Sequence, residues 1–384
     1  MIRNLVGPPV LGIDFIGRKK ELNAAWNALA ATNSLLLSSP RRVGKSSFAR
    51  KLIEKAKEKE WSAIYLDVQG IKNETEFGGY LLTELQKIKN EASHTESIKN
   101  KIGKLFHSVK KVEFMDFGVE FDKSPQLFYA KLDETFPLPK RTLIVIDELA
   151  IYLQQLVKDG DISRAETFMN WLRNVRQKEV QNISWIFCSS VSINNFLSQH
   201  GISYTINDIS SFHLGEMNEA DALLLLEQLN HSNRQIMDDH QIRYVLARIQ
   251  WKLPFFIQLF FKTYSINSDE YKKISIEEAT DLIFKDMANE HQLYTWSERL
   301  SGYGKDEKIA RLLLNYFCLP KHKSDRKHLE SLIATIALPD DDIAERYSTV
   351  KQMLESDGYI VQEEGKIYFR SPIIREFWFN KYIR

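Results

Sequence analysis

Four short apolar segments, separated by segments of helical periodicity, constrain the fold of this chain more than any other feature. They are residues 34–39 (SLLLSS), 62–68 (SAIYLDV), 142–149 (TLIVIDEL) and 184–190 (SWIFCSS). Continuous apolar strands that alternate with helices are typical of a parallel sheet covered by helices on both faces. The sequence therefore predicts an α/β fold for this part of the chain.

The remainder of the chain has a different pattern. From Asn218 it is predicted to be helical to about residue 300, with Asn218 and Asp221 placed as in a capping box. A helix is then predicted at 343–357, followed by a hairpin that turns at Glu364-Gly365. Helices followed by a terminal hairpin suggest a winged helix. Within the charged segment 90–125, the alternation at 109–121 suggests a hairpin insertion.

Length, charge, cysteine spacing and the absence of long apolar runs indicate the class of protein. A length of 384 residues suggests two or three domains, and a net charge of +1 provides no overall field toward nucleic acid or lipid. Cys188 and Cys318 lie far apart, which argues against a disulfide framework and fits a reducing cytoplasm. No apolar run approaches the ~18 residues that would span a bilayer. We therefore expect a cytoplasmic protein that does not bind membranes.

The window 39–46 follows the first apolar segment and precedes a helix, as in the phosphate-binding pattern G-x-x-x-x-G-K-[ST]. It departs from that pattern at its first position, where Ser39 replaces glycine. Gly44 lets the backbone turn near phosphate, and the amides that follow lie at a helix N-terminus. Lys45 is predicted to contact the β- and γ-phosphates and Ser46 to bind Mg²⁺. The other predicted nucleotide contacts are Ser39, Pro40, Arg41, Arg42, Val43, Gly44 and Ser47.

A second motif ends the segment 142–149. Its apolar residues deliver Asp147 to the carboxyl edge of the predicted sheet, where open α/β sheets bind ligands. Asp147 is predicted to hold Mg²⁺ and Glu148 to polarise the attacking water as a general base. Two solvated acids at a strand end are the alternative. Ser190, at the end of the next strand, is a further candidate for contact with the γ-phosphate or water, and a plain strand end is its alternative.

These motifs resemble those of the archaeal-type P-loop ATPases, which stand near the STAND and AAA+ classes. The resemblance extends over nearly the whole chain. It is carried by SSPRRVGKSS, similar to the family's APRRxGKTS loop, and by LIVIDEL, WKLPFFIQLFF and the terminal FRSP at 369–372. It implies a P-loop ATPase domain, a helical lid and a winged helix, with expected bounds of 1–214, 215–300 and 301–384.

The same resemblance implies further site residues. Phe15, Ile16, Gly17 and Arg18 belong to a box expected near the adenine, and Pro254 is expected at the edge of the lid, facing the base or ribose. In related classes the state of the nucleotide sets the arrangement of the domains. The resemblance therefore implies an ATP- and Mg²⁺-dependent switch.

Several other side chains have both a functional and a structural interpretation. Arg41 and Arg42 could contact phosphate or lie in solvent, and a transition-state arginine could be any of Arg370, Arg375, Arg173 and Arg176. His231, His240 and His291 are expected at the surface because their spacing fits no metal site. Trp171, Trp251 and Trp296 are expected in the core.

Charge bears on DNA binding. Residues 301–384 contain 14 Lys and Arg against 13 Asp and Glu, and the helix at 343–357 is net negative. A helix that reads the major groove is normally basic, so packing or docking of a partner is favoured over DNA binding.

Three functions follow as alternatives. The first is an Mg²⁺-dependent ATPase switch that hydrolyses the β–γ bond, slowly without a partner. The second is a nucleotide-binding regulatory module with negligible hydrolysis that gates a partner effector. The third is a DNA-handling ATPase, which the nearly neutral terminal region disfavours. A protein partner or self-association is expected in addition to ATP and ADP.

Overall fold

The computed structural model describes residues 1–31, 34–92, 125–136, 138–158, 162–178, 182–189, 193–338 and 341–384. The predicted hairpin insertion at 109–121 lies outside them. The chain separates into two compact units. We call Lys19–Ser38 with Lys45–Leu214 the sheet unit, and Met1–Arg18 with Ser39–Gly44 and Gly215–Arg384 the helical unit.

The sheet unit contains a five-stranded parallel sheet in the order β2-β3-β4-β1-β5. The strands are β1 (Ser34–Ser38), β2 (Ser62–Asp67), β3 (Thr142–Asp147), β4 (Ile183–Ser189) and β5 (Ile209–Phe212). The four predicted strands are confirmed to within one or two residues. Because β4 lies between β3 and β1, the loops that follow β1 and β3 emerge on either side of the end of β4.

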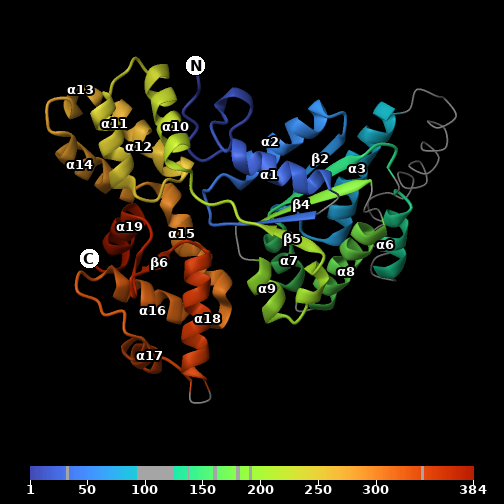
Figure 1. Cartoon of the computed structure of the whole chain (residues 1–384). Coiled ribbons are helices and arrows are strands. Elements are labelled where there is room, and N and C mark those ends of the chain that lie inside the picture. The colour runs from blue at the N-terminus through green and yellow to red at the C-terminus, as the bar shows by residue number, and fades with distance from the viewer. Residues whose placement is uncertain are drawn as a thin grey trace. The chain divides into compact units, whose positions relative to one another are not determined.

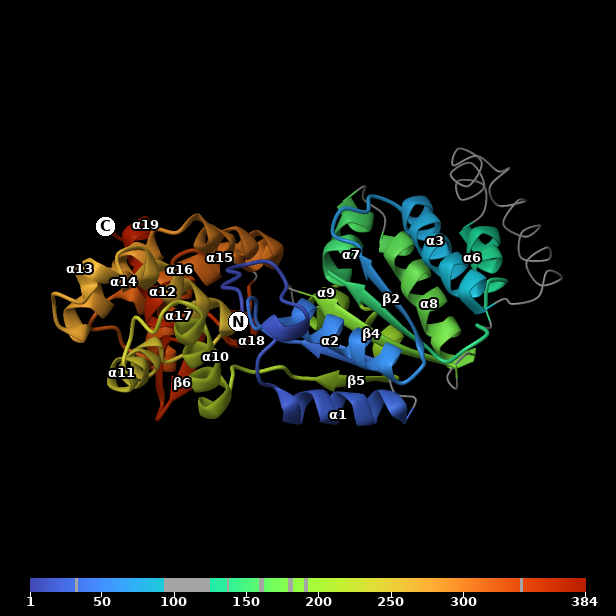
Figure 2. The ribbon, with the colours of Figure 1, turned by 90° about the horizontal axis from the view of Figure 1, so that it is seen from above.

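Helices cover both faces of this sheet, as predicted, because its strands are apolar on both sides. The helices are α1 (Lys19–Ala30), α2 (Lys45–Glu58), α3 (Glu74–Ala92), α6 (Pro125–Asp133), α7 (Leu149–Lys158), α8 (Ile162–Lys178), α9 (Ile193–Gln199) and η2 (Ser203–Ile206). Figure 1 shows α1 and α2 above the strands and α7, α8 and α9 below them. Figure 2 shows β2, β4 and β5 between α1 and α3.

The strand residues divide between the two faces by alternation. Leu36, Ile144, Ile146, Trp185 and Phe187 belong to one buried cluster with residues of α3, α6, α7, α8 and α9. Their neighbours along each strand point to the opposite face, which α1 and α2 cover. The alternation places Tyr65, Asp147 and Cys188 on the face of α2.

The helical unit carries the N-terminal segment, the loop 39–44 and the chain from Gly215 onward. Its elements are η1 (Gly12–Asp14), α10 (Glu219–Ser232), α11 (Asp239–Ile249), α12 (Pro254–Ile266), α13 (Ser268–Tyr271), α14 (Ile276–Ala288), η3 (His291–Leu293), α15 (Tyr294–Glu298), η4 (Arg299–Asp306), α16 (Glu307–Cys318), α17 (Arg326–Ala334), α18 (Ile343–Ser356), β6 (Ile360–Glu363), β7 (Lys366–Phe369) and α19 (Pro372–Tyr382). The chain from Asn218 to about residue 300 is mostly helical, as predicted, and Asn218 caps α10 by accepting from the backbone N–H of Asp221.

The terminal pattern is also confirmed. Helix α18 is followed by the antiparallel pair β6–β7, which turns at Glu364 (φ 48°) and Gly365 (φ 78°). Trp251, Trp296, Tyr359 and Trp378 pack edge to face in this unit, with ring centroids between 5.3 and 6.5 Å apart. The three tryptophans expected in the core are all buried. The division into three domains, including a separate winged helix, stays a prediction.

Candidate functional site

The loop 39–44 connects β1 to α2, and its backbone is shaped to expose amides. Arg42 (φ 66°) and Gly44 (φ 96°) adopt positive φ with Val43 between them. Such alternation of backbone angles turns successive N–H groups to one side and forms an anion-binding nest. Lys45 then begins α2, so the first free amides of that helix follow the nest directly. The loop therefore presents backbone donors suited to phosphate oxygens.

Other side chains of the helical unit hold residues 42 and 43 of this loop. The buried Arg18 donates from Nη2 to the carbonyl oxygen of Val43 at 3.2 Å and to that of Gly215 at 2.8 Å. The guanidinium of Arg42 lies 4.7 Å from the ring centroid of Phe255. These contacts determine the path of the loop backbone just before Gly44.

Asp147 ends β3 and Lys45 follows the loop after β1, and these two strands flank β4. The thiol of Cys188, near the end of that strand, is fully buried. Burial raises its pKa well above the usual value, the charges of Asp147 and Glu148 raise it further, and that of Lys45 lowers it. All three charged groups therefore lie within electrostatic reach of one buried sulfur. Lys45 from the loop motif and Asp147 and Glu148 from the strand motif therefore lie at the same edge of the sheet.

The carboxylate of Asp147 has two neighbours that position it. Its Oδ1 accepts the backbone N–H of Glu148 at 3.0 Å, and its Oδ2 accepts the hydroxyl of Tyr65 on β2. The guanidinium of Arg50, on α2, covers the ring of Tyr65 at 3.9 Å. Burial, followed by the charge of Asp147, raises the pKa of Tyr65, so this hydroxyl keeps its proton and acts as a donor at neutral pH.

Glu148 has an uncommon backbone conformation. Its φ of 63° places it in the left-handed region, which is unfavourable for a residue with a side chain. Its carbonyl accepts the N–H of Ile151 at 3.0 Å and so starts α7. Residues held in such conformations are concentrated at functional sites. The strained backbone is consistent with a functional role for Glu148, in which the orientation of the side chain offsets the cost in stability.

Mg²⁺ and ATP are the groups that this pattern implies, and two observations fit them. No described residue comes within 4 Å of the position that a Cβ on Gly44 would take, so that side of the loop is open. Each oxygen of Asp147 retains an acceptor position beyond its bond to Tyr65 or Glu148. The carboxylate of Asp147 and the hydroxyl of Ser46 are oxygen ligands of the kind that Mg²⁺ prefers.

The other predicted site residues lie as follows. Gly17 (φ 76°) packs against Asp221, whose Oδ2 accepts the backbone N–H of Arg18 at 2.7 Å. Phe15 and Ile16 precede them and are half-buried, and Pro254 is the first residue of α12. The guanidinium of Arg18 donates hydrogen bonds to backbone carbonyls, so this side chain supports the conformation of the loop. The roles of the other four toward adenine stay predictions.

Two other groups of predicted residues can be placed. Ser189, buried at the end of β4, pairs in register with Ser38, whereas Ser190 lies outside the described residues. All four candidate arginines engage their own surroundings. Arg173 donates from Nη1 to the carbonyl oxygen of Tyr204 at 2.9 Å. Arg176 forms a buried pair with Asp208 at 2.9 Å, Arg375 donates to the carbonyl of Cys318, and Arg370 covers Trp251.

The sequence does not single out Tyr65, Arg50 or Arg299. Tyr65 lies in an apolar strand, where a tyrosine is unremarkable until the strand register is known. Arg299 lies in a segment without a motif. No signal in the sequence separates these residues from ordinary core or surface positions.

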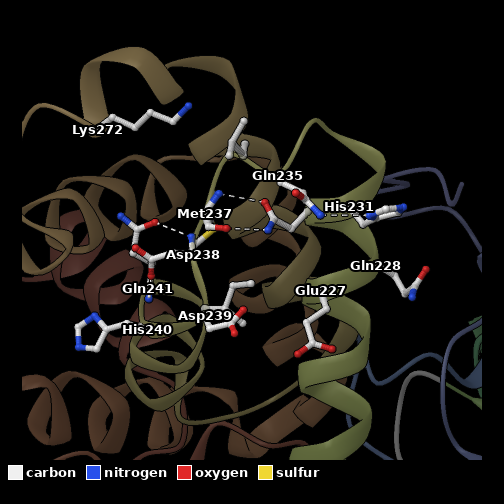
Figure 3. Close-up of a pocket in the computed structure, with 13 residues that line it drawn as sticks. Glu227, Gln228, His231, Gln235, Met237, Asp238, Asp239, His240, Gln241 and Lys272 are labelled. Carbon is white, nitrogen blue, oxygen red and sulfur yellow. Dashed lines mark hydrogen bonds between the residues drawn. The ribbon is translucent and has the colours of Figure 1, made fainter.

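A groove of about 1010 Å³ lies between α10 and α11 (Figure 3). Its polar groups are used by the chain itself. Asn230 bonds both the N–H and the carbonyl of Met237, and Asp238 with Gln241 forms a capping box. Among the described residues, no group of His, Cys, Asp and Glu has metal-binding geometry, and His231 and His240 are exposed as expected. This groove is therefore explained by helix capping.

The basic residues of α18 are neutralised within the helical unit. Arg346 pairs with Asp306 at 2.7 Å and with Asp341, and Lys351 pairs with Glu355 at 2.9 Å. Arginines and lysines that already have carboxylate partners contribute little to phosphate binding. The structure thus adds to the charge argument against DNA binding by this helix.

Comparisons with known proteins show the class of fold. No protein-family model matches the sequence, and no curated protein matches it significantly. Several solved structures resemble it along most of its length. The Walker-type ATPase PABY2304 of Pyrococcus abyssi has a TM-score of 0.64 at 14% identity, with 98% of this chain and 99% of that chain covered. The ORC2 protein of Aeropyrum pernix, in ADPNP–ADP complexes, has a TM-score of 0.55 at 14% identity, with 97% and 94% covered.

The chain therefore has the fold of the P-loop ATPases: a parallel five-stranded sheet followed by a helical C-terminal region. No helix in the described part of the chain is long and apolar enough to cross a membrane.

Proposed function

We propose that this protein binds ATP with Mg²⁺ at the loop 39–46 and hydrolyses it. The observation that carries the proposal is the convergence of Lys45, Asp147 and Glu148 on the end of β4, beside a loop with nest geometry. Loop amides and Lys45 bind the phosphates, and Ser46 and Asp147 hold the metal. Bound Mg²⁺ supplies neutralisation of phosphate charge. Glu148 takes the proton of the attacking water.

The proposal includes a switch. The boundary between the two compact units falls inside the loop, between Gly44 and Lys45. Arg18, Phe255 and Trp251 of the helical unit lie around residues 40–43 of the loop. A nucleotide that orders the loop therefore acts on the packing of the helical unit. This supports a switch in which the packing of segment 215–384 differs between the ATP-bound and the ADP-bound protein.

The decisive experiment measures ATP binding and phosphate release for wild type, Lys45→Ala and Glu148→Gln. Lys45→Ala is expected to lose binding, because it removes the charge next to the phosphates. Glu148→Gln is expected to keep binding and to lose turnover by roughly 10²–10⁴-fold, as for loss of a general base. Unchanged turnover in Glu148→Gln would remove that residue from its role.

Matched controls separate these effects from general damage. Lys51→Ala removes another lysine of α2, paired with Glu54 at 2.6 Å, and Glu166→Gln removes an exposed carboxylate bonded to Tyr204. Both are expected to behave as wild type. Binding without any phosphate release in the wild type would favour the regulatory module without hydrolysis. A steep dependence of turnover on protein concentration would indicate self-association.

A further inference from the structure

A second groove, of about 680 Å³, lies beside the hairpin β6–β7 within the helical unit. We call it the hairpin groove. Val361, Glu363 and Tyr368 line it from one face of the hairpin, since Val361 pairs with Tyr368 and alternate residues of a strand share a face. The chain after α16 and the start of α19 also line it, together with Trp251. Its volume lies in the range of sites that bind ligands.

The wall that follows α16 is fixed to the hairpin by hydrogen bonds. The ring nitrogens of His322 lie 2.9 Å from the carbonyl oxygen of Leu319 and 2.7 Å from that of Ile367 on β7. The hydroxyl of Ser324 accepts the N–H of Ile367 at 2.9 Å. The groove is therefore formed before any ligand binds, and a formed site lowers the entropic cost of binding.

Aromatic and aliphatic side chains provide the apolar part of the groove. Trp251 and Phe317 are buried, whereas Leu319 and Tyr368 are each 40% exposed. An apolar group of a ligand placed on Leu319 and Tyr368 would remove apolar surface from water. Tryptophan, tyrosine and arginine are also the residues that most often dominate the energy of protein interfaces.

Two arginines of the groove carry charge without an acidic partner. Among the residues that the structure describes, neither Arg370 nor Arg375 forms an ion pair, and both line the groove. Arg370 lies over the ring of Trp251 at 5.1 Å, and Arg375 uses Nη2 for the carbonyl oxygen of Cys318 at 2.9 Å. A guanidinium presents five N–H donors, so each side chain keeps donors for an anionic group of a ligand.

Two carboxylates in the same groove determine what kind of anion fits. Oε2 of Glu216 accepts the N–H of Lys252 at 2.8 Å, and Glu363 pairs with Lys366 in the hairpin register. Nucleic acid would bring a row of phosphates against these carboxylates as well as against the arginines. A peptide matches the mixed charge, because it offers carboxylates to arginine and N–H groups to glutamate. The groove therefore favours a peptide over nucleic acid.

We infer that the hairpin groove binds a peptide segment of a partner protein. An apolar side chain of the peptide lies against Leu319 and Tyr368, and a neighbouring carboxylate bonds to Arg370 and Arg375. Guanidinium matches carboxylate in geometry as well as in charge. The inference does not depend on the proposed ATP site, since every residue that carries it belongs to the helical unit.

The test selects peptides from a phage-displayed library of random dodecapeptides, on wild type and on a variant that carries both Arg370→Gln and Arg375→Gln. Wild type is expected to enrich peptides in which Asp or Glu lies close to an aliphatic or aromatic residue, and the double variant is expected not to retain them. Absence of enrichment on wild type, or retention of the same peptides by the double variant, would overturn the inference.

The most enriched peptide is then synthesised with a fluorescein label, and its affinity is measured by fluorescence polarisation without nucleotide. Arg370→Gln and Arg375→Gln are each expected to weaken binding by about tenfold, as for loss of a charged hydrogen bond. Tyr368→Ser, at an exposed position, tests the apolar half and should weaken binding several-fold. Arg248→Gln, whose exposed side chain pairs with Asp281, is the matched control and should bind as wild type does.

Labelled single-stranded and duplex DNA provide the competing case. If DNA binds, Arg370→Gln weakens that binding and no peptide is selected, the groove takes nucleic acid and the inference is wrong. Peptide affinities that are the same in wild type and all three groove variants would likewise place the peptide elsewhere. Because no nucleotide is present, either result stands whether or not the protein hydrolyses ATP.

Discussion

The hydroxyl of Tyr65 donates a hydrogen bond to Oδ2 of Asp147, across the neighbouring strands β2 and β3. In the register of these strands, Tyr65 pairs with Val145 and so projects from the same face as Asp147, two residues further on. The covering guanidinium of Arg50 holds the phenol ring in place. The carboxylate that we propose as a magnesium ligand is therefore oriented by a residue outside both sequence motifs.

Replacement of Tyr65 by phenylalanine tests this orientation. The ring and its contact with Arg50 remain, but Asp147 loses one donor, at a cost of about 1 kcal/mol in unfolding free energy. We expect turnover to require several-fold more Mg²⁺, while ATP affinity without Mg²⁺ stays unchanged. The measurement is a titration of turnover with Mg²⁺. Tyr80→Phe, which removes a hydroxyl bonded to the carbonyl of Tyr65 at 3.3 Å, serves as the control. Coincident Mg²⁺ curves for Tyr65→Phe and wild type would show that the hydrogen bond has no role.

Arg18 provides a test of the loop's support. Lysine in its place keeps the charge but cannot reach the carbonyls of Val43 and Gly215 together. We expect a loss of about 1–3 kcal/mol in unfolding free energy and weaker binding of both ATP and ADP. Urea unfolding and calorimetry measure the two effects. Arg243→Lys, on the exposed face of α11, should change neither. Full nucleotide affinity in Arg18→Lys would show that the loop keeps its shape without this side chain.

Two glycines near the terminal hairpin form a matched pair. Gly358 (φ 82°) and Gly365 (φ 78°) share a backbone conformation that costs alanine about 1–2 kcal/mol. A Cβ on Gly358 would lie 2.5 Å from Trp251 and 3.0 Å from Pro40 of the loop, whereas no described residue comes within 4 Å at Gly365. We expect Gly358→Ala to lose more stability than Gly365→Ala and, unlike it, to weaken ATP binding. Equal effects of the two changes would mean that Trp251 and Pro40 move aside freely.

Stability is expected to fall at alkaline pH. Burial above all raises the pKa of Tyr65, Tyr129 and Tyr152 in the sheet unit above the ordinary value of about 10. In the unfolded chain these groups lose their protons near pH 10, whereas the folded state keeps them. The folded state therefore binds more protons above pH 10, and the unfolding free energy falls by up to about 1.4 kcal/mol per pH unit for each tyrosine. Below about pH 9 the three tyrosines are protonated in both states and do not change the pH dependence of the unfolding free energy. Urea unfolding from pH 8 to 11 measures the trend.

Tyr152 gives that trend a specific check. Its hydroxyl is buried and has no hydrogen-bond partner among the described residues. Phenylalanine removes an unsatisfied polar group while it keeps the ring, so Tyr152→Phe should raise stability by about 1 kcal/mol at neutral pH. It should also reduce the alkaline slope by about one proton. A variant that is less stable than wild type at pH 7 would contradict the assignment of this hydroxyl as unpaired.

Local pattern was sufficient for much of this protein. The strands that end at Ser38 and Asp147, the cap at Asn218 and the turn at Glu364 could be predicted because each depends on residues within a few positions of one another. The short strand β5 was not among the predicted strands. Its sequence, ISSF, contains two exposed serines and no apolar run, so only its pairing with β1 makes it a strand.

Tertiary structure decided the rest, because contacts between distant segments depend on strand register and on packing that no local period encodes. The loop motif identified Lys45 and the apolar strand identified Asp147, but only the order β3-β4-β1 brings both around Cys188. Tyr65 became a partner of Asp147 only through the register of β2 and β3. Arg299 lies far along the chain in a segment without a motif. The fold buries its guanidinium without a hydrogen-bond partner among the described residues, and burial is a property of the folded chain alone.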